Sequence, residues 1–167
     1  GFHFVAPWNK VYKYNTKQQE IFEKGMEVLS SNGLVITLDV SVLYQPKLDE
    51  LGILHKTKGE EYRNTVIIPE IRAVARSVIG RYTPEQLYSS KRDAIQNEIF
   101  EETQRKVEKQ HVQLNAVLVR DVTLPQKIKD AIERKLSQEQ ESLEYEFRLE
   151  KAQKEAQRQK IDAEGKA

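Results

Sequence analysis

The sequence contains no cysteine, and no apolar run in it is long enough to cross a membrane. Without cysteine, neither a disulfide framework nor a thiolate metal site can form. Neither charge is in excess: 27 Lys and Arg stand against 26 Asp and Glu, so the net charge is +1. This balance gives no electrostatic case for nucleic acid, and we expect no nucleic-acid partner. The 167 residues, 38% of them hydrophobic, predict one sizeable domain with an appendage.

Catalytic patterns are missing as well. His3, His55 and His111 lie in separate segments, at no spacing typical of a metal site. Neither a phosphate-binding glycine loop nor a dinucleotide fingerprint occurs. Glu101 and Glu102 are adjacent on a predicted helix and point about 100° apart, so they form no acid–base pair. The sequence therefore predicts no catalytic residue, no metal site and no cofactor, and an enzyme would need a clustered polar pocket.

Three segments have the character of strands. Residues 10–15, "KVYKYN", show a short apolar–polar pattern. Residues 34–46, "LVITLDVSVLYQP", alternate over their whole length, and the "SSNG" turn at 30–33 predicts a hairpin with the preceding segment. Residues 112–125 return to alternation. The faces predicted to be apolar are Leu34, Ile36, Leu38, Val40, Val42 and Tyr44 in the second segment, and Val112, Leu114, Ala116 and Leu118 in the third.

Between these strands the period becomes helical. A short helix is expected after Pro46, ending near Gly52. A longer one follows Glu60, in which Pro69 bends the helix or marks its first turn. Thr83 and Pro84 form a helix start, and another helix follows through residues 91–110. The predicted inner faces are Ile67, Ile71, Val74, Val78 and Tyr82 in the first long helix, and Ile95, Ile99, Phe100, Thr103 and Val107 in the second.

Residues 126–164 contain neither glycine nor proline and are rich in charges of both signs, which predicts one long helix. Two hypotheses are open for it: a solvated single helix, or a coiled-coil element that assembles many copies through weak contacts. Alanine buries little area, so an alanine-rich seam needs close neighbours or many copies in register. The candidate seam, at alternating spacings of four and three, is Tyr145, Leu149, Ala152, Ala156, Gln159 and Ala163.

The aromatic residues of "GFHFVAPW" are a second candidate site. Phe2 and Phe4 fall on one strand face, and Trp8 follows Pro7. Tryptophan is enriched where proteins meet a membrane interface, so these three residues are candidates for a membrane-proximal position. Packing in a core is the alternative. The chain opens without an initiator methionine, which suggests that it is a fragment of a longer protein.

Several stretches together resemble one family. They are "GFHFVAPW", "NGLVITLDVSVLYQP", the region from "EYRNT" at residue 61 to "IERK" at residue 135, and "EAQRQKIDAEGKA" at the end. Their order and spacing resemble the SPFH (band 7) domain family, most closely its prohibitin branch. The resemblance implies an α+β fold: a mixed, mostly antiparallel sheet packed by helices, followed by a long coiled-coil helix. It implies an SPFH domain at residues 1–122, without its anchor and first strand, and the start of the long helix at residues 123–167.

The same resemblance implies a function. Its members are non-enzymatic scaffold subunits that assemble with copies of themselves or with related subunits into rings or cages on a membrane. They attach to the bacterial or mitochondrial inner membrane through an N-terminal segment that this chain lacks, so we expect the fragment itself to be soluble. An alternative hypothesis is a regulatory module that engages and restrains a membrane-bound AAA protease.

Overall fold

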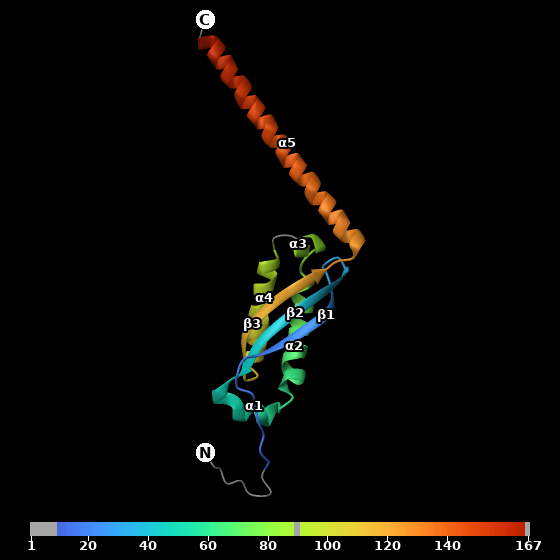
Figure 1. Ribbon diagram of the computed structural model, residues 1–167, viewed down its shortest axis with the longest axis vertical. Coiled ribbons are helices and arrows are strands. Elements are labelled where there is room, and N and C mark those ends of the chain that lie inside the picture. Colours follow the sequence, from blue (N-terminus) through green and yellow to red (C-terminus); the bar gives the residue numbers. More distant parts are fainter. Residues whose placement is uncertain (1–9, 89–90, 166–167) are drawn as a thin grey trace. The chain divides into compact units, whose positions relative to one another are not determined.

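The computed structural model describes residues 10–88 and 91–165. Two units follow one another along the chain, residues 1–124 and residues 125–167 (Figure 1). The first unit combines a sheet with helices, and the described part of the second is one helix. The predicted α+β class with a long C-terminal helix is therefore confirmed.

The sheet has three strands in the order β1, β2, β3, and both pairs are antiparallel. They are β1 (Gln19–Leu29), β2 (Val35–Pro46) and β3 (Val112–Thr123). The turn between β1 and β2 contains Gly33 at φ +79°, a backbone conformation that glycine adopts without steric cost. Its N–H donates to the Ser30 carbonyl at 3.0 Å, so the predicted hairpin is confirmed.

Strand β2 carries the centre of the core. Its alternation predicts one buried face, and the residues of that face from Ile36 to Tyr44 are 0–1% exposed. Helices α2 and α4 pack against the sheet and against each other, with α2 on β1 and α4 on β3. The strand therefore buries its apolar side chains under two helices, as its period of two requires.

Strand β3 departs from the predicted alternation. Val112 and Leu114 are buried as expected, but beyond them the buried residues are Val117 and Val119 instead of Ala116 and Leu118. The reason is a register shift: Tyr44 pairs with Leu114 and Leu43 with Ala116, which leaves Asn115 as an extra residue in β3. A β-bulge of this kind exchanges the two faces of the strand from that point on. The prediction for the second half of the face was wrong.

The first helical segment consists of η1 (Leu48–Glu50), a 3₁₀ turn, and α1 (Leu51–Thr57). The expected end near Gly52 is wrong, because the helix runs past Gly52 for five more residues. It ends where Gly59 adopts φ +80°. The N–H groups of Lys58 and Gly59 both donate to the Leu54 carbonyl, at 2.8 and 3.0 Å, and so satisfy the open end of the helix.

The next segment combines a π-helical turn, η2 (Arg63–Ile67), with α2 (Ile68–Ile79). Pro69 lies in the first turn of α2, which is one of its two predicted positions. The predicted inner face is buried from Ile67 to Val78. Tyr82 lies beyond the helix and is half-buried, with its hydroxyl donating to Glu98 Oε2 at 2.5 Å.

Two further helices complete the first unit: α3 (Pro84–Tyr88) and α4 (Arg92–Glu108). Thr83 caps α3 as predicted: its Oγ1 accepts from the Gln86 N–H at 3.3 Å, and its own N–H donates to Gln86 Oε1 at 3.0 Å. In α4 the predicted inner face is buried apart from Phe100, which is half-buried.

Residues 10–18 form no strand, contrary to prediction. They pair with no other strand, and side-chain contacts hold them instead. The Tyr14 hydroxyl lies 2.5 Å from His55 Nδ1, and the Tyr14 ring stacks on Tyr62 with 6.3 Å between centroids. Two apolar–polar repeats are too few to specify a strand by themselves, and the segment pairs with neither outer strand of the sheet.

Helix α5 (Gln126–Gly165) is the described part of the second unit. It is continuous over 40 residues, about 60 Å at 1.5 Å per residue, and the prediction of one long helix is confirmed. Residues with high helix propensity and the absence of proline and of any glycine before Gly165 explain its continuity.

Candidate functional site

Most of helix α5 packs against no other residue of the described chain. Every described residue from Ser137 to Gly165 is exposed. Helical segments without tertiary packing are marginally stable in water, because helix propensity alone hardly offsets the entropy of ordering the backbone. The surface of this helix is therefore open to solvent from Ser137 to Gly165.

One face of α5 carries the candidate seam. At 100° per residue, positions separated by alternating steps of four and three lie on one side of a helix. Tyr145 and Leu149 are 64% and 46% exposed, and the remaining seam positions are small or polar and also exposed. The small side chains of Ala152 and Ala156 allow close approach of a second helix. The geometry thus keeps the predicted seam together on one exposed face.

The opposite face of α5 carries three large apolar residues that the sequence analysis did not predict as a contact surface. Leu143, Phe147 and Ile161 are 64%, 68% and 67% exposed. Leu143 and Ile161 are 18 residues apart, about five full turns, so they share one face. Leu143 and Tyr145 differ by two residues, which places them about 200° apart around the helix. We call Leu143, Phe147 and Ile161 the second stripe.

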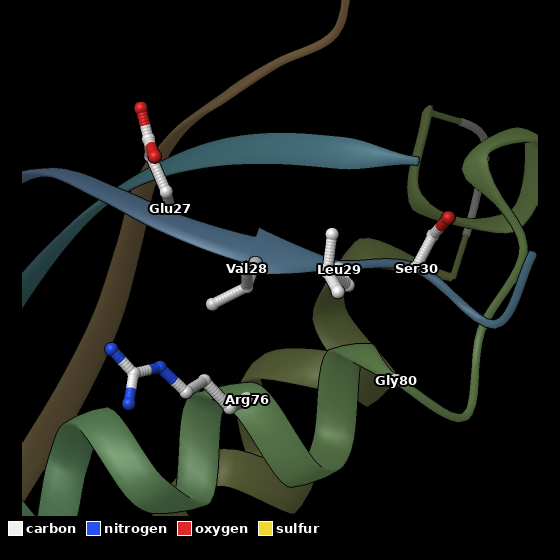
Figure 2. A pocket seen from close by; sticks show the side chains of 6 residues that line it. All are labelled: Glu27, Val28, Leu29, Ser30, Arg76 and Gly80. Carbon is white, nitrogen blue, oxygen red and sulfur yellow. The ribbon is translucent and has the colours of Figure 1, made fainter. Parts of the chain in front are cut away.

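A cleft in the first unit lies between the end of β1 and the end of α2. Its volume is about 390 Å³, and Val28, Leu29, Arg76 and Gly80 are among its lining residues. Figure 2 shows Val28 pointing from β1 toward α2, with the Arg76 side chain alongside and Glu27 directed the opposite way. The cleft combines apolar surface with one cation, which is binding chemistry and not catalytic chemistry.

Ser30, at the rim of the same cleft, is engaged in the hairpin turn. Its hydroxyl donates to Asn32 Oδ1, and its oxygen accepts from the Leu34 N–H at 3.1 Å. An activated serine nucleophile needs a general base within hydrogen-bond reach, and an amide oxygen is not such a base. Ser30 therefore stabilises the turn.

Three tyrosine rings, from Tyr14, Tyr44 and Tyr62, lie close together in the first unit. Tyr62 is buried, and its ring meets Tyr44 edge-on with 6.0 Å between centroids. Burial raises the pKa of Tyr62 to about 12, with the neighbouring Tyr44 and Tyr14 adding to the effect. Burial likewise raises the pKa of Tyr44 and of Tyr14. These phenols stay neutral at physiological pH. Tyr44 and Tyr62 pack in the core, and Tyr14 is half-buried beside them.

The model of the "SPFH domain / Band 7 family" matches residues 1–160. The chain belongs to the SPFH (band 7) family. Similar curated proteins include Prohibitin-1 of Colletotrichum higginsianum (25% identical), Prohibitin-1 of Saccharomyces cerevisiae (26%) and "Prohibitin-7, mitochondrial" of Arabidopsis thaliana (26%). Each alignment covers 100% of this chain and 58–60% of the relative, so the chain spans about three fifths of their length.

Within this SPFH chain, the predicted membrane-proximal residues Phe2, Phe4 and Trp8 lie outside the described residues, as does His3. His55 contacts Tyr14, and His111 lies 3.2 Å from Glu50 Oε1, so the two described histidines do not meet. Over residues 10–88 and 91–165, no group of three or more His, Asp or Glu side chains is placed to hold a metal ion. In the same ranges, no helix has the length and apolar character to cross a membrane.

The second stripe could have been found from the sequence. Leu143 and Phe147 are four residues apart, and large apolar residues are rare in this part of the chain, so their spacing is a helix-face signal in its own right. The regular four–three pattern through the alanines predicts a contact face on the other side of the helix only. An SPFH helix with two exposed stripes differs from one with a single seam in the number of neighbours that it can contact.

Proposed function

We propose that this chain is part of a non-enzymatic, membrane-associated scaffold subunit of the prohibitin type, which assembles into large ring or cage oligomers. The observation that carries the proposal is the pair of apolar stripes on opposite faces of α5. A helix with one apolar stripe can bury that stripe against a single neighbouring helix. A helix with two opposed stripes needs a neighbour on each side, and such contacts propagate until the array closes.

The two stripes also differ in shape. Ala152 and Ala156 leave a shallow surface on one side, while Leu143 and Phe147 project from the other. Large side chains that enter the spaces left by small ones are the basis of close helix packing. We infer head-to-tail contacts in which the second stripe of one copy meets the seam of the next.

The rest of the chain supports the same proposal. The family match and the prohibitin names of the relatives favour a membrane scaffold. The word "mitochondrial" in one relative's name agrees with the mitochondrial member of the two inner membranes that the resemblance implies. We assign lateral contacts to the SPFH domain, residues 1–122, and circumferential contacts to the second segment, residues 123–167, whose helix α5 begins at Gln126. Membrane attachment would come from a preceding segment together with Phe2, Phe4 and Trp8.

The test replaces Ala152 and Ala156 with Glu. Each substitution adds a charge and bulk to a contact that every copy repeats, so a loss of about 1 kcal/mol per contact abolishes large particles. The matched control, Gln153→Glu with Gln157→Glu, adds the same charge at the same spacing but between the stripes, about 280° and 320° around the helix from Leu143. Native gels of detergent-solubilised membranes report particle size, and circular dichroism checks the fold. Unchanged particles in the seam variant would show that α5 is not the assembly element.

The alternative hypothesis, a module that restrains a membrane-bound AAA protease, makes a different prediction. The cleft between β1 and α2 is one of several concave surfaces of the first unit, and we propose it for a partner segment because apolar residues line it beside Arg76. Affinity capture from solubilised membranes would then enrich a protease, and Arg76→Glu would abolish that enrichment while particle size stays the same. Capture of copies of the chain alone would reject this alternative.

A further inference from the structure

The outer edge of β1 runs beside helix α2. Two clefts of about 390 and 310 Å³ follow one another along it. From the strand side they are lined by the consecutive residues 23–30, and from α2 by Arg72, Arg76 and Gly80, which are four residues apart and share one side of the helix. Side chains of one face of a strand recur at every second residue, so an unbroken run of lining residues places the clefts along the strand's edge. We call the two clefts together the β1–α2 groove.

Backbone groups of β1 are directed into this groove. The Ser30 N–H donates to the Leu34 carbonyl at 2.9 Å, so these two residues form a hydrogen-bonded pair of the antiparallel ladder. Such pairs alternate with pairs whose N–H and C=O groups face outward. Counting back along the register, Leu29 and Glu27 belong to pairs of the outward kind. The position of Leu29 agrees, because a Cβ added to Gly80 of α2 would lie 3.8 Å from its carbonyl oxygen.

These outward groups meet no other strand in the part of the chain that the structure describes. Strand β1 pairs there with β2 only, and it forms one outer edge of the sheet. Figure 1 shows β1 with α2 on one side of the sheet and β3 with α4 on the other. The two edges can therefore be compared directly.

The β3 edge is covered by side chains of α4. The Arg92 guanidinium donates to the carbonyl groups of Val119 and Arg120 at 3.2 and 2.7 Å. Gln96, one turn further along α4, accepts from the Val119 N–H at 2.9 Å through Oε1. Uncovered edges invite pairing with a strand of another chain, and covering them prevents it. The fold thus protects the β3 edge and leaves a groove along the β1 edge.

A β-bulge limits the open part of the β1 edge to its last residues. Residues 24 and 25 together stand opposite Asp39 alone. Gly25 has φ +69°, and its N–H donates to Asp39 Oδ1 at 2.8 Å, on the side of β2. A bulge of this kind interrupts the pairing of a strand. The stretch that can accept a new strand is therefore residues 26–29, beside the larger cleft.

The side chains of the groove determine which kind of strand fits. Val28 and Leu29 give the larger cleft an apolar wall, and Leu29 is 55% exposed. Arg72 has an acidic partner on β1, whereas Arg76 is exposed and takes part in no ion pair within the described ranges. Figure 2 shows the Arg76 side chain beside the cleft, with Glu27 directed the opposite way. A segment with carboxylates on one side and aliphatic residues on the other complements this surface.

We propose that the β1–α2 groove is a docking site for an extended acidic segment of a partner protein, which joins the sheet as a fourth strand beside β1. Its backbone pairs with the outward groups of Glu27 and Leu29, its carboxylates meet Arg76, and its aliphatic side chains lie against Leu29. The proposal deepens the alternative hypothesis above, since it states how a partner segment binds. It rests on the groove alone, and it requires neither a protease nor assembly through α5.

The test measures binding of a fluorescein-labelled peptide, Thr-Val-Glu-Val-Glu-Val-Thr with blocked ends, to the 167-residue chain by fluorescence anisotropy. A matched peptide with Lys in place of Glu should bind at least about fivefold more weakly, because Arg76 repels it. Arg76→Glu should reverse this preference. Arg105→Glu, which changes an exposed arginine of α4 outside the groove, is the control and should leave the preference unchanged. Circular dichroism verifies the fold of each variant.

A second measurement separates strand pairing from attraction between charges alone. Hydrogen exchange followed by NMR should show fast exchange of the Glu27 and Leu29 amides in the free chain and slow exchange with the acidic peptide bound. The Val28 amide, which faces β2, should be protected in both states. N-methylation of every second peptide residue removes the donors of one peptide edge, so one methylation register should abolish binding and the other should not.

Several outcomes would overturn the proposal. These are no binding of the acidic peptide, equal binding of both peptides, or unchanged exchange of the Glu27 and Leu29 amides at saturating peptide. Protection of the same two amides that rises with protein concentration in the absence of peptide would assign the edge to contacts between copies instead. Peptide binding by the isolated chain is read without membranes or particles, so this proposal and the scaffold proposal fail independently.

Discussion

Thr103 is completely buried in α4, and its hydroxyl is the only buried side-chain oxygen or nitrogen without a hydrogen-bond partner in the part of the chain that the structure describes. A buried hydroxyl without a partner costs free energy, because it has given up its hydrogen bonds to water. Its neighbours on the inner face of the helix, Ile99 and Val107, are apolar and equally buried. The position accepts the shape of threonine without using its polarity.

The first prediction follows from this residue. Thr103→Val keeps the shape and removes the unpaired oxygen, so the free energy of unfolding should rise by about 1 kcal/mol. Thr103→Ser is the matched control, since it keeps the hydroxyl and deletes the methyl group, and it should lower the free energy of unfolding by about 1 kcal/mol. Urea denaturation followed by circular dichroism measures both. A Val variant less stable than the wild type would show that the hydroxyl has a partner.

At the scale of single elements, the sequence predicted what depends on local pattern. The alternation of β2, the capping of α3 by Thr83 and the continuity of α5 are all confirmed. Each depends on signals contained within the element: a period of two, a hydroxyl before proline, or the absence of helix breakers. The α+β class follows from the order of such elements.

The features that could not be predicted from the sequence depend on residues outside the element concerned. The bulge at Asn115 arises from pairing with Leu43 and Tyr44, more than 60 residues away, and no local pattern in β3 marks it. The end of α1 is set by the positive φ of Gly59, whereas Gly52 was the expected terminator. Glycine ends a helix only where the backbone turns left-handed, and two glycines in one stretch do not show which one does.

For α5, the second prediction concerns how the two stripes pair. If the contacts are head-to-tail, the variant Ala152→Glu with Ala156→Glu blocks the seam. The variant Leu143→Ser with Phe147→Ser blocks the second stripe. Either variant alone should form no large particle. Mixing the two variants should restore one contact per pair and yield heterodimers, because each supplies the stripe that the other lacks. Analytical ultracentrifugation of the mixture measures this. Homodimers of each single variant would contradict the head-to-tail scheme and indicate like-with-like contacts.

At the scale of the whole molecule, the tyrosines link stability to alkaline pH. Tyr62 has a folded pKa of about 12, against an ordinary value of 10.0, and the pKa of Tyr82 is raised by its hydrogen bond to Glu98. When the folded pKa is the higher one, the folded state keeps a proton that the unfolded chain releases. Stability is therefore fully present below pH 10 and falls between about pH 10 and pH 12.

The third prediction is that the free energy of unfolding declines by roughly 2 kcal/mol over this interval on account of Tyr62. Tyr62→Phe should flatten the decline, because phenylalanine has no proton to lose. Tyr145→Phe, in the exposed part of α5, is the control and should change nothing. Urea midpoints at a series of alkaline pH values give the slopes. Equal slopes in the Tyr62→Phe variant and the wild type would show that this ring does not govern alkaline stability.

The placement of the two stripes on α5 also bears on curvature. In a closed array of parallel helices, each helix is a vertex of a polygon, and the angle between its two contact faces is the interior angle of that polygon. The stripes are close to diametrically opposed, so each vertex turns the wall only slightly. Interior angles near a straight line belong to polygons with many sides. If the proposed scaffold closes through these two stripes, it would therefore be a wide enclosure of many copies, and a substitution that moved one stripe by a single residue around the helix would change its diameter.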